Sequence, residues 1–323
     1  THLGKYTTGD DDLSIDDYAI ALEKAVQNKE FSIPFDIVIH STGALVVRSW
    51  LSHYYKPNRN SPIRKFIMVA PANNGSRLAS WGKKIPWDWG NKVLDTLRLA
   101  SKYTWSLNWE WLTSQRHSNM NGLEIYHLQG TKNDIAFPSV FDAFDSIFGI
   151  DIPVFEEEGS DNTIRFCAAN LNMKGVRLSK GQKMPDADIY EIKGIPVYVF
   201  KERSHFGDKH GILGSISKKS NPVFKVIDNI LKSANPQPTG EQTFPKYMML
   251  DIRVVDQLGN PHSDFIPRFY FGKGSDKSHL KILQRTENNE IDCYYLKCNA
   301  LSKVSKFGFH IEGNKIGKAE YMP

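Results

Sequence analysis

The feature that most constrains the fold is a strand-like apolar run that passes through a serine-containing turn into a helix-like apolar run (residues 35–50). The β-branched residues at 37–39 predict a buried strand. A turn of sequence His-Ser-Thr-Gly follows, centred on Ser41, and the Ala, Leu and Val residues after it predict a helix over 44–54. Such a turn raises the Ser41 hydroxyl above the sheet edge, and Gly43 leaves room for the helix to pack close to the strand. The stretch therefore predicts an α/β fold with a serine exposed at the end of a strand.

A serine held in this way is suited to nucleophilic attack on a carbonyl carbon. The N–H of Thr42, the residue after the serine, can donate to the oxyanion that such an attack creates. The usual first glycine of the Gly-x-Ser-x-Gly pattern is replaced by Ile39, so only one of its two glycines is present. A serine in an ordinary strand-to-helix turn is the alternative interpretation, and the candidate partners decide between the two.

A nucleophilic serine needs a histidine as general base and an acid that orients the histidine. The last apolar run typical of a sheet strand covers residues 195–200, and His205 follows it almost directly. We therefore predict His205 as the base, with His210 as the alternative. On position alone the acid is Asp134, which lies just beyond the strand predicted at 123–130. Serine, acid and histidine then follow one another in the order typical of this kind of site.

Composition narrows the class of protein. The chain has 323 residues, of which 40% are hydrophobic and 24% charged, as is typical of a soluble globular protein with one large domain and room for a small one. A net charge of +5, spread along the chain, is compatible with contact with an anionic membrane surface but does not indicate a nucleic-acid partner. We expect no signal peptide and no transmembrane segment. No cysteine or histidine spacing suggests a metal, and we expect no cofactor; the oligomeric state is not predicted.

A tryptophan-rich segment follows the next predicted strand (63–70). It predicts a helical cap at about 75–121. Six of the seven tryptophans lie in it: Trp81, Trp87, Trp89, Trp105, Trp109 and Trp111. Their rings can form an apolar face for acyl chains or simply fill the core between cap and sheet, and both interpretations stay open.

The pattern changes after residue 232. Residues 233–242 are rich in Pro, Asn, Gln and Gly and predict a linker. Beyond them, short apolar runs separated by turn residues predict a small β-sandwich over 243–323. No catalytic group of residues is evident in it. The chain is thus predicted to comprise a catalytic α/β domain (1–232) and a β-sandwich accessory domain.

Several blocks of the sequence together resemble bacterial lipase-like α/β-hydrolases of the triacylglycerol lipase or esterase type. The blocks are residues 36–48, 69–76, 97–105 and 159–165. The resemblance implies a doubly wound, mostly parallel sheet and a Ser-His-Asp triad. It also implies that the acid lies on an Asp-Gly-x-Val-type segment, which Asp161 matches with Asn162 in place of the glycine. This moves the predicted acid from Asp134 to Asp161.

The same resemblance implies a further strand and a His-Gly loop ahead of Thr1, which would supply the second oxyanion donor. No such stretch precedes residue 35, so that donor is not identified and the N-terminal part of the domain is expected to be absent from the chain. The resulting hypothesis is a carboxylic ester hydrolase of lipid metabolism that cleaves lipid or phospholipid acyl esters. The alternatives are an acyltransferase or amidase with the same triad, and a non-catalytic protein that binds lipid or protein.

Overall fold

The computed structural model describes most of the chain in segments. They are residues 13–77, 92–132, 159–179, 186–207, 210–214, 216–233, 236–238, 244–256, 258–262, 265–271, 278–279, 282–287, 290–297 and 307–313, with Tyr6, Ala79 and Glu157. The chain divides into two compact units, Thr1–Pro245 and Lys246–Pro323. Each unit has a sheet structure of its own.

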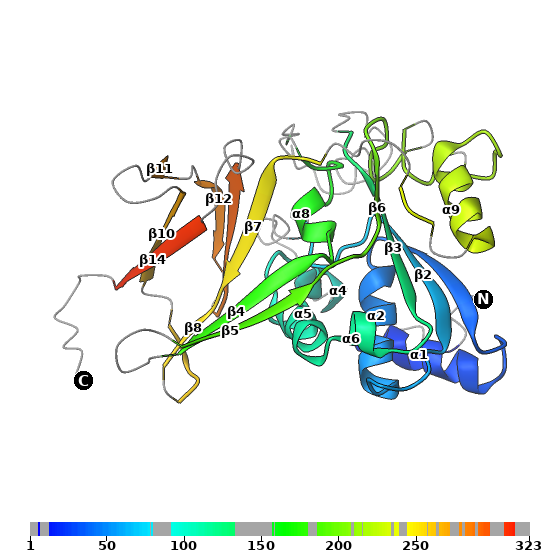
Figure 1. Cartoon of the computed structure of the whole chain (residues 1–323), viewed down its shortest axis with the longest axis horizontal. Coiled ribbons are helices and arrows are strands. Elements are labelled where there is room, and N and C mark those ends of the chain that lie inside the picture. Colours follow the sequence, from blue (N-terminus) through cyan, green and yellow to red (C-terminus); the bar gives the residue numbers. More distant parts are fainter. Residues whose placement is uncertain are drawn as a thin grey trace. The chain divides into compact units, whose positions relative to one another are not determined.

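The first unit is built on a four-stranded sheet in which every neighbouring pair is parallel (Figure 1). The strands, in spatial order, are β1 (Phe35–His40), β2 (Ile63–Val69), β3 (Glu124–Gly130) and β6 (Val197–Phe200). Parallel strands carry their carboxyl ends to one edge of the sheet, where open α/β sheets bind ligands. The segments that follow these four strands are therefore brought together.

Helices cover both faces of this sheet. They are α1 (Ile15–Gln27), α2 (Gly43–Tyr54) and α9 (Pro222–Lys232). Side chains alternate along a strand, so Phe66 and Met68 of β2 enter the apolar core shared with α1 and α2, whereas Ile67 and Val69 enter the core shared with α9. The predicted mixed α/β fold with a parallel central sheet is confirmed.

The chain between β2 and β3 forms α4 (Lys92–Thr96), α5 (Lys102–Ser114) and α6 (Arg116–Asn119). Trp111 of α5 is fully buried in the core that contains α2, so this ring is a core residue. The ring of Trp109 stacks on that of Trp105, with centroids 6.0 Å apart. The other three tryptophans of the segment, Trp81, Trp87 and Trp89, lie outside the described residues.

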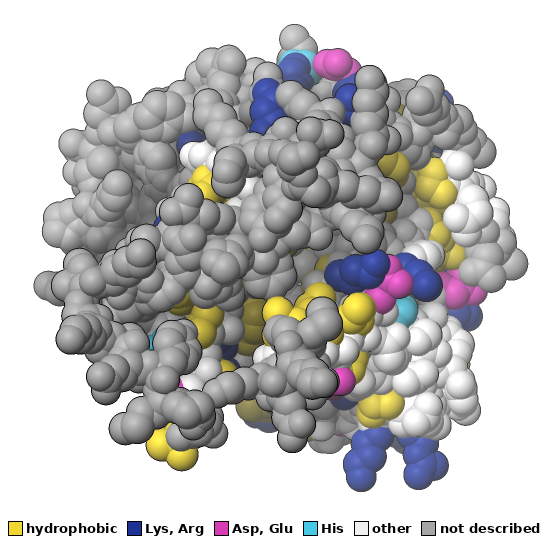
Figure 2. All heavy atoms as spheres, turned by 60° about the vertical axis from the view of Figure 1, so that its left-hand side comes forward, with side chains coloured by type: hydrophobic (Ala, Val, Ile, Leu, Met, Phe, Trp, Pro, Cys, Tyr) yellow, Lys and Arg dark blue, Asp and Glu magenta, His cyan; other side chains and the backbone are white. Residues whose placement is uncertain are grey.

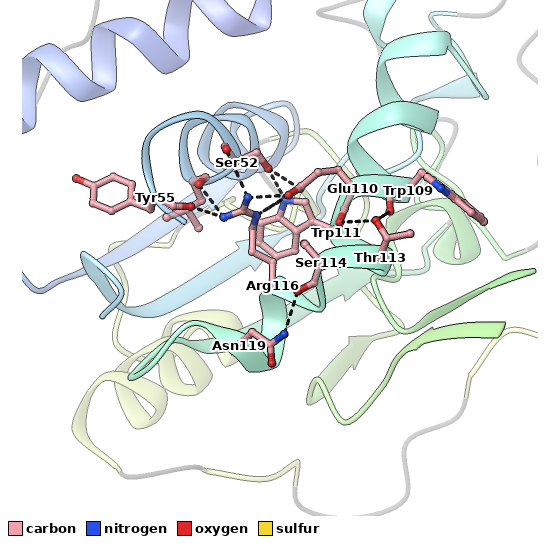
Figure 3. Close-up of polar contacts among 10 residues, drawn as sticks. Ser52, Tyr55, Trp109, Glu110, Trp111, Thr113, Ser114, Arg116 and Asn119 are labelled. Atoms are coloured by element: carbon pink, nitrogen blue, oxygen red, sulfur yellow. Dashed lines mark hydrogen bonds and ion pairs between the residues drawn. The ribbon is translucent and has the colours of Figure 1, made fainter. Parts of the chain in front are cut away.

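Arg116 closes the carboxyl end of α2 (Figure 3). Its side chain is only 4% exposed and forms an ion pair with Glu110, with 2.7 Å between Nη2 and Oε1. It also donates to the backbone carbonyls of Leu51, Ser52 and Tyr55. These carbonyls lie in the last turn of α2 and at the Tyr55 cap that follows it, where a helix runs out of backbone N–H donors. Since α2 begins at the serine turn, this contact anchors the helix that carries the turn.

A two-stranded antiparallel ribbon, which the sequence analysis did not predict, consists of β4 (Met173–Ser179) and β5 (Asp186–Ile192). One face packs on α5, where the Arg177 guanidinium lies 5.3 Å from the ring centroid of Trp109. A Cβ at Gly175 would come within 2.9 Å of Trp109, so this position needs glycine. The opposite face exposes three apolar side chains: Val176 (46%), Leu178 (48%) and Ile189 (65%).

The described residues of the second unit form strands and their connections, with no helix among them. One antiparallel sheet has the order β12 (Ile282–Glu287), β13 (Asp292–Lys297) and β7 (Tyr247–Ile252). Another has the order β11 (Ser278–His279), β10 (Phe265–Phe271) and β14 (Phe307–Gly313). The short strands β8 (Val254–Val255) and β9 (Pro261–His262) form a third pair. The ring of Phe269 lies 5.2 Å from that of Tyr294, which links the two larger sheets through apolar contact. Among all the helices of the described chain, none is long and apolar enough to cross a membrane.

Candidate active site

Ser41 lies at the tip of a strained turn between β1 and α2. Its φ is 53°, a left-handed conformation that a residue with a side chain adopts only when its surroundings enforce it. The Ser41 N–H donates to the carbonyl of Val69 at 3.0 Å, and the N–H of Ala72 donates to the carbonyl of Ser41 at 3.2 Å. The turn is thus tied on both sides to the end of β2.

Close packing of α2 on β1 explains the pattern of glycines around the serine. A Cβ added to Gly43 would lie 3.2 Å from the Cβ of Ile39, which is closer than nearly all real Cβ contacts. Glycine at 43 therefore leaves the room that the side chain of Ile39 occupies, where the common pattern has its first glycine. The incomplete pattern is still compatible with a tight turn.

Three predicted residues meet at the carboxyl edge of the sheet. Nε2 of His205 lies 3.0 Å from Oγ of Ser41, and Nδ1 of His205 lies 2.8 Å from Oδ2 of Asp161. The side chains of His205 and Asp161 are completely buried. The imidazole is therefore placed to accept the proton of the serine hydroxyl through one nitrogen while the other nitrogen donates to the carboxylate.

Asp161 is held by its own loop. Its Oδ1 accepts the N–H groups of Thr163 at 3.1 Å and Ile164 at 2.7 Å. Asn162 has a φ of 75°, a left-handed conformation that glycine and asparagine tolerate better than other residues. This accounts for asparagine where the resembling hydrolases have glycine. The helix α8 (Phe166–Ala169) follows the loop directly.

The histidine loop follows β6 and closes on itself. The N–H of Ser204 donates to the carbonyl of His210 at 2.9 Å, and the N–H of Ile212 donates to the carbonyl of Ser204 at 2.7 Å. The N–H of His205 donates to the carbonyl of Asp161 at 3.0 Å, which joins the two loops. The imidazole that contacts the Ser41 hydroxyl is that of His205, so His205 and not His210 occupies the position predicted for the base.

Three polar residues of the site were not singled out from the sequence. Nε2 of Gln129 lies 2.8 Å from Oδ2 of Asp161, and Oε1 of Gln129 lies 3.3 Å from Nε2 of His127. Both side chains are fully buried on β3, and burial lowers the pKa of His127 to about 4. The third residue, His40, places its ring centroid 4.7 Å from that of His205, and burial lowers its pKa to about 4 as well. The available signal was a polar glutamine within a segment predicted to be a sheet strand.

Two further predicted residues complete the comparison with the sequence. Thr42 is the N-cap residue of α2, directly after Ser41, so its N–H lies at the amino end of that helix. Asp134, the acid predicted from position alone, lies outside the described residues. Within the described segments, no group of three or more His, Cys, Asp or Glu side chains could hold a metal ion.

Comparison with known proteins finds similar folds among solved structures. No protein-family model matches the chain, and no curated protein matches it significantly. Among solved structures, phospholipase PlaB from Legionella pneumophila in complex with thio-NAD is similar, with a TM-score of 0.76 and 24% identity over 95% of this chain and 75% of that one. A second structure of PlaB gives a TM-score of 0.75 and 24% identity over 95% of this chain and 76% of that one. The likeness establishes the fold. The resemblance to lipase-like hydrolases noted in the sequence is confirmed at that level.

Proposed function

We propose that the protein is a serine hydrolase that cleaves carboxylic esters, with Ser41 as nucleophile, His205 as general base and Asp161 as the acid that orients it. The observation that carries the proposal is the continuous hydrogen-bonded line from the Ser41 hydroxyl through both ring nitrogens of His205 to the Asp161 carboxylate. A serine at a strained turn, with a buried histidine and carboxylate behind it, is a costly arrangement that structure alone does not require.

The mechanism follows from this geometry. Ser41 Oγ attacks the ester carbonyl carbon while its proton passes to Nε2 of His205. Asp161 keeps the Nδ1–H tautomer of the imidazole and stabilises the imidazolium that forms. The N–H of Thr42 donates to the oxyanion, and loss of one such donor costs roughly 3–4 kcal/mol in comparable sites. His205 then protonates the departing alcohol, and water attacks the acyl-enzyme by the same route in reverse.

Lipid or phospholipid acyl esters are the proposed substrates. The support is the likeness in fold to a protein named as a phospholipase, together with the lipase-like sequence blocks around Ser41 and Asp161. An acyltransferase or amidase would use the same three residues. Hydrolysis and acyl transfer are separated by measuring, in one reaction, the free acid and the new ester formed after an alcohol is added. A new ester as the main product would make the protein an acyltransferase. Faster cleavage of the matching amide than of the ester would make it an amidase.

The test of the proposal is hydrolysis of a short 4-nitrophenyl ester and of a diacyl phospholipid by the full chain and by Ser41→Ala. Ser118→Ala is the matched control, because Ser118 is exposed on the short helix α6. We expect Ser41→Ala to lose turnover of both esters and the control to retain it. Equal turnover by Ser41→Ala and the unchanged chain would exclude the proposed mechanism.

We also propose that the exposed face of the β4–β5 ribbon contacts an anionic lipid surface. Its three apolar side chains, Val176, Leu178 and Ile189, are flanked on the same two strands and just beyond them by Lys174 and Lys193. Both ammonium groups pair with the carboxylate of Glu191, which leaves one net positive charge beside the apolar side chains. Figure 2 shows a face on which apolar side chains lie beside Lys or Arg and acidic side chains. Apolar side chains with basic neighbours suit the boundary between acyl chains and anionic head groups.

Sedimentation with vesicles tests this contact. Ile189→Ser should weaken binding to vesicles that contain phosphatidylserine, whereas Leu258→Ser, at an exposed turn residue of the second unit, should not. Equal binding by both variants would exclude the ribbon as the contact. A change in oligomeric state without a change in vesicle binding would assign the face to a second copy of the chain.

For the organisation of the chain we propose a catalytic domain (1–232) with a cap within about 75–121, and an accessory β-sandwich (243–323). The support is the division into compact units between Pro245 and Lys246, and the packing of Phe269 against Tyr294 in the second unit.

A further inference from the structure

The carboxylate of Asp161 has a second partner inside the sheet. Oδ2 accepts from Nδ1 of His205 at 2.8 Å and from Nε2 of Gln129 at 2.8 Å, so the two donors share one oxygen. Gln129 belongs to β3, a central strand of the sheet, and is fully buried. The carboxylate is therefore held by hydrogen bonds from its own loop and from a central strand of the sheet.

The orientation of the Gln129 amide can be derived from its neighbours. An ionised carboxylate only accepts hydrogen bonds, so Gln129 must present its NH₂ group to Asp161 and its carbonyl oxygen to His127. That oxygen in turn needs a donor, which assigns the ring proton of His127 to Nε2, 3.3 Å away. His127 is completely buried and its Nδ1 has no partner among the described residues. A neutral ring with its single proton on Nε2 satisfies this arrangement.

We propose that Gln129, fixed by His127, is a positioning residue that holds Oδ2 of Asp161 and thereby sets the basicity of His205. The role rests on the proposed serine-hydrolase function. A donor on Oδ2 withdraws negative charge from the oxygen that binds the imidazole, so it weakens the stabilisation of the imidazolium. It also prevents the carboxylate from turning away from His205. Neither residue touches a substrate, and both act only through Asp161.

Other groups around the His205 imidazole also affect its basicity. The polar groups that face His205 in the described chain are Ser41, Asp161 and His40. The ring of His40, at the end of β1, is tilted by 37° against that of His205. Burial and the neighbouring His205 keep the pKa of His40 low, at about 4, so His40 is neutral above about pH 5. The ring of Phe206 packs edge-on against His205 and carries no charge. The Gln129 contact is therefore the neutral polar contact to Asp161 that a substitution can remove without changing net charge.

The test is the titration of the His205 imidazole by NMR in the full chain labelled in its histidines, with the signal assigned by its absence in His205→Gln. Gln129→Met keeps the volume and removes the donor. We expect it to move the midpoint of the His205 titration up by about half a pH unit or more, because the imidazolium gains charge on Oδ2. The matched control is Gln27→Met, which removes an exposed glutamine on α1 that is bonded to Glu23. Its midpoint should equal that of the unchanged chain.

Further variants test whether His127 acts on Asp161 through Gln129. His127→Phe should shift the midpoint in the same direction but less, and the double variant should behave like Gln129→Met alone, since His127 acts through Gln129. Gln129→Leu also removes the donor and serves if the methionine variant does not fold. It should move the midpoint in the same direction as Gln129→Met. An unchanged midpoint in a folded Gln129→Met or Gln129→Leu sample overturns the inference.

Ester turnover separates this inference from the proposed function. In the unchanged chain, absence of ester turnover would refute the proposed function, while the NMR titration still decides the role of Gln129. If turnover is present, Gln129→Met should lower kcat about tenfold with KM unchanged and move the acid limb of the pH profile by the same amount as the NMR midpoint. A lower kcat with an unmoved acid limb would mean that Gln129 has only a structural role, and would also overturn the inference.

Discussion

Replacing Asp161 by asparagine should reverse the tautomer of His205. Oδ1 of Asp161 accepts the N–H groups of Thr163 and Ile164. These two donors would hold the oxygen of an asparagine side chain at the same place, so its NH₂ group would face Nδ1 of His205. An NH₂ group cannot accept a hydrogen bond, and Nδ1 would have to become the acceptor. The ring proton would then lie on Nε2 and point at Ser41.

A histidine with its proton on Nε2 cannot accept the proton of the serine hydroxyl. The same error of tautomer in a trypsin-type triad lowers kcat about 10⁴-fold, and this corresponds to about 5.4 kcal/mol of activation free energy. We expect a loss of that order for Asp161→Asn, with little change in KM. The NH₂ group would also meet that of Gln129, so the unfolding free energy should fall by about 1–3 kcal/mol.

The assay is release of 4-nitrophenol from a short acyl ester near pH 8, with near-UV circular dichroism to verify the fold. Asp228→Asn is the matched control, because Asp228 pairs with Lys232 on the exposed side of α9. The control should keep its activity. A folded Asp161→Asn variant with turnover within tenfold of the unchanged chain would refute the assignment of the acid.

Three stability predictions rest on buried polar groups and can be measured by urea unfolding. Arg116→Met removes the guanidinium that pairs with Glu110 and donates to three carbonyls at the end of α2, and should cost about 3–5 kcal/mol. Arg64→Met, which breaks the solvent-exposed pair with Asp36, should cost much less, and equal losses would contradict this. Lys65→Met removes a buried ammonium that donates to the carbonyls of Ile230, Leu231 and Ser233 at the end of α9, and should cost about 2–3 kcal/mol. Burial lowers the pKa of His127 from 6.5 to about 4, so the unfolded chain binds more protons between these values and stability falls as the pH drops. In His127→Phe the dependence of the unfolding free energy on pH should therefore be flatter in that window by up to about 1.4 kcal/mol per pH unit, and an unchanged slope would show that this histidine is not neutral in the fold.

The parts of the fold that depend on local sequence could be predicted from it. The helix predicted at 44–54 is α2 (Gly43–Tyr54), and the strand predicted at 63–70 is β2 (Ile63–Val69). Both are set by periodicity and by the turn residues at their ends. His205 could be chosen because it follows the last apolar strand, and parallel strands bring their exits together.

Features set by contacts between distant segments were harder to predict. Asp161 lies after a long connection rather than at a strand exit, and its place depends on a backbone contact with His205, 44 residues away. Position alone therefore favoured Asp134, and the sequence resemblance was needed to choose Asp161. Gln129 carries no local signal beyond a polar side chain near the end of a predicted strand. The ribbon of β4 and β5 was missed although its residues alternate, because its pairing is set by packing of one face on α5.

The most direct test of the central claim is labelling of the full chain with a fluorophosphonate probe, followed by mass spectrometry of the labelled peptide. The probe reacts with a serine only when a base activates it and an oxyanion can be stabilised. The proposed site predicts one probe per chain, attached to Ser41, no label in Ser41→Ala and strongly slowed labelling in His205→Gln. Absence of label in folded protein, or a label that persists in Ser41→Ala, would contradict the claim that Ser41 is an activated nucleophile.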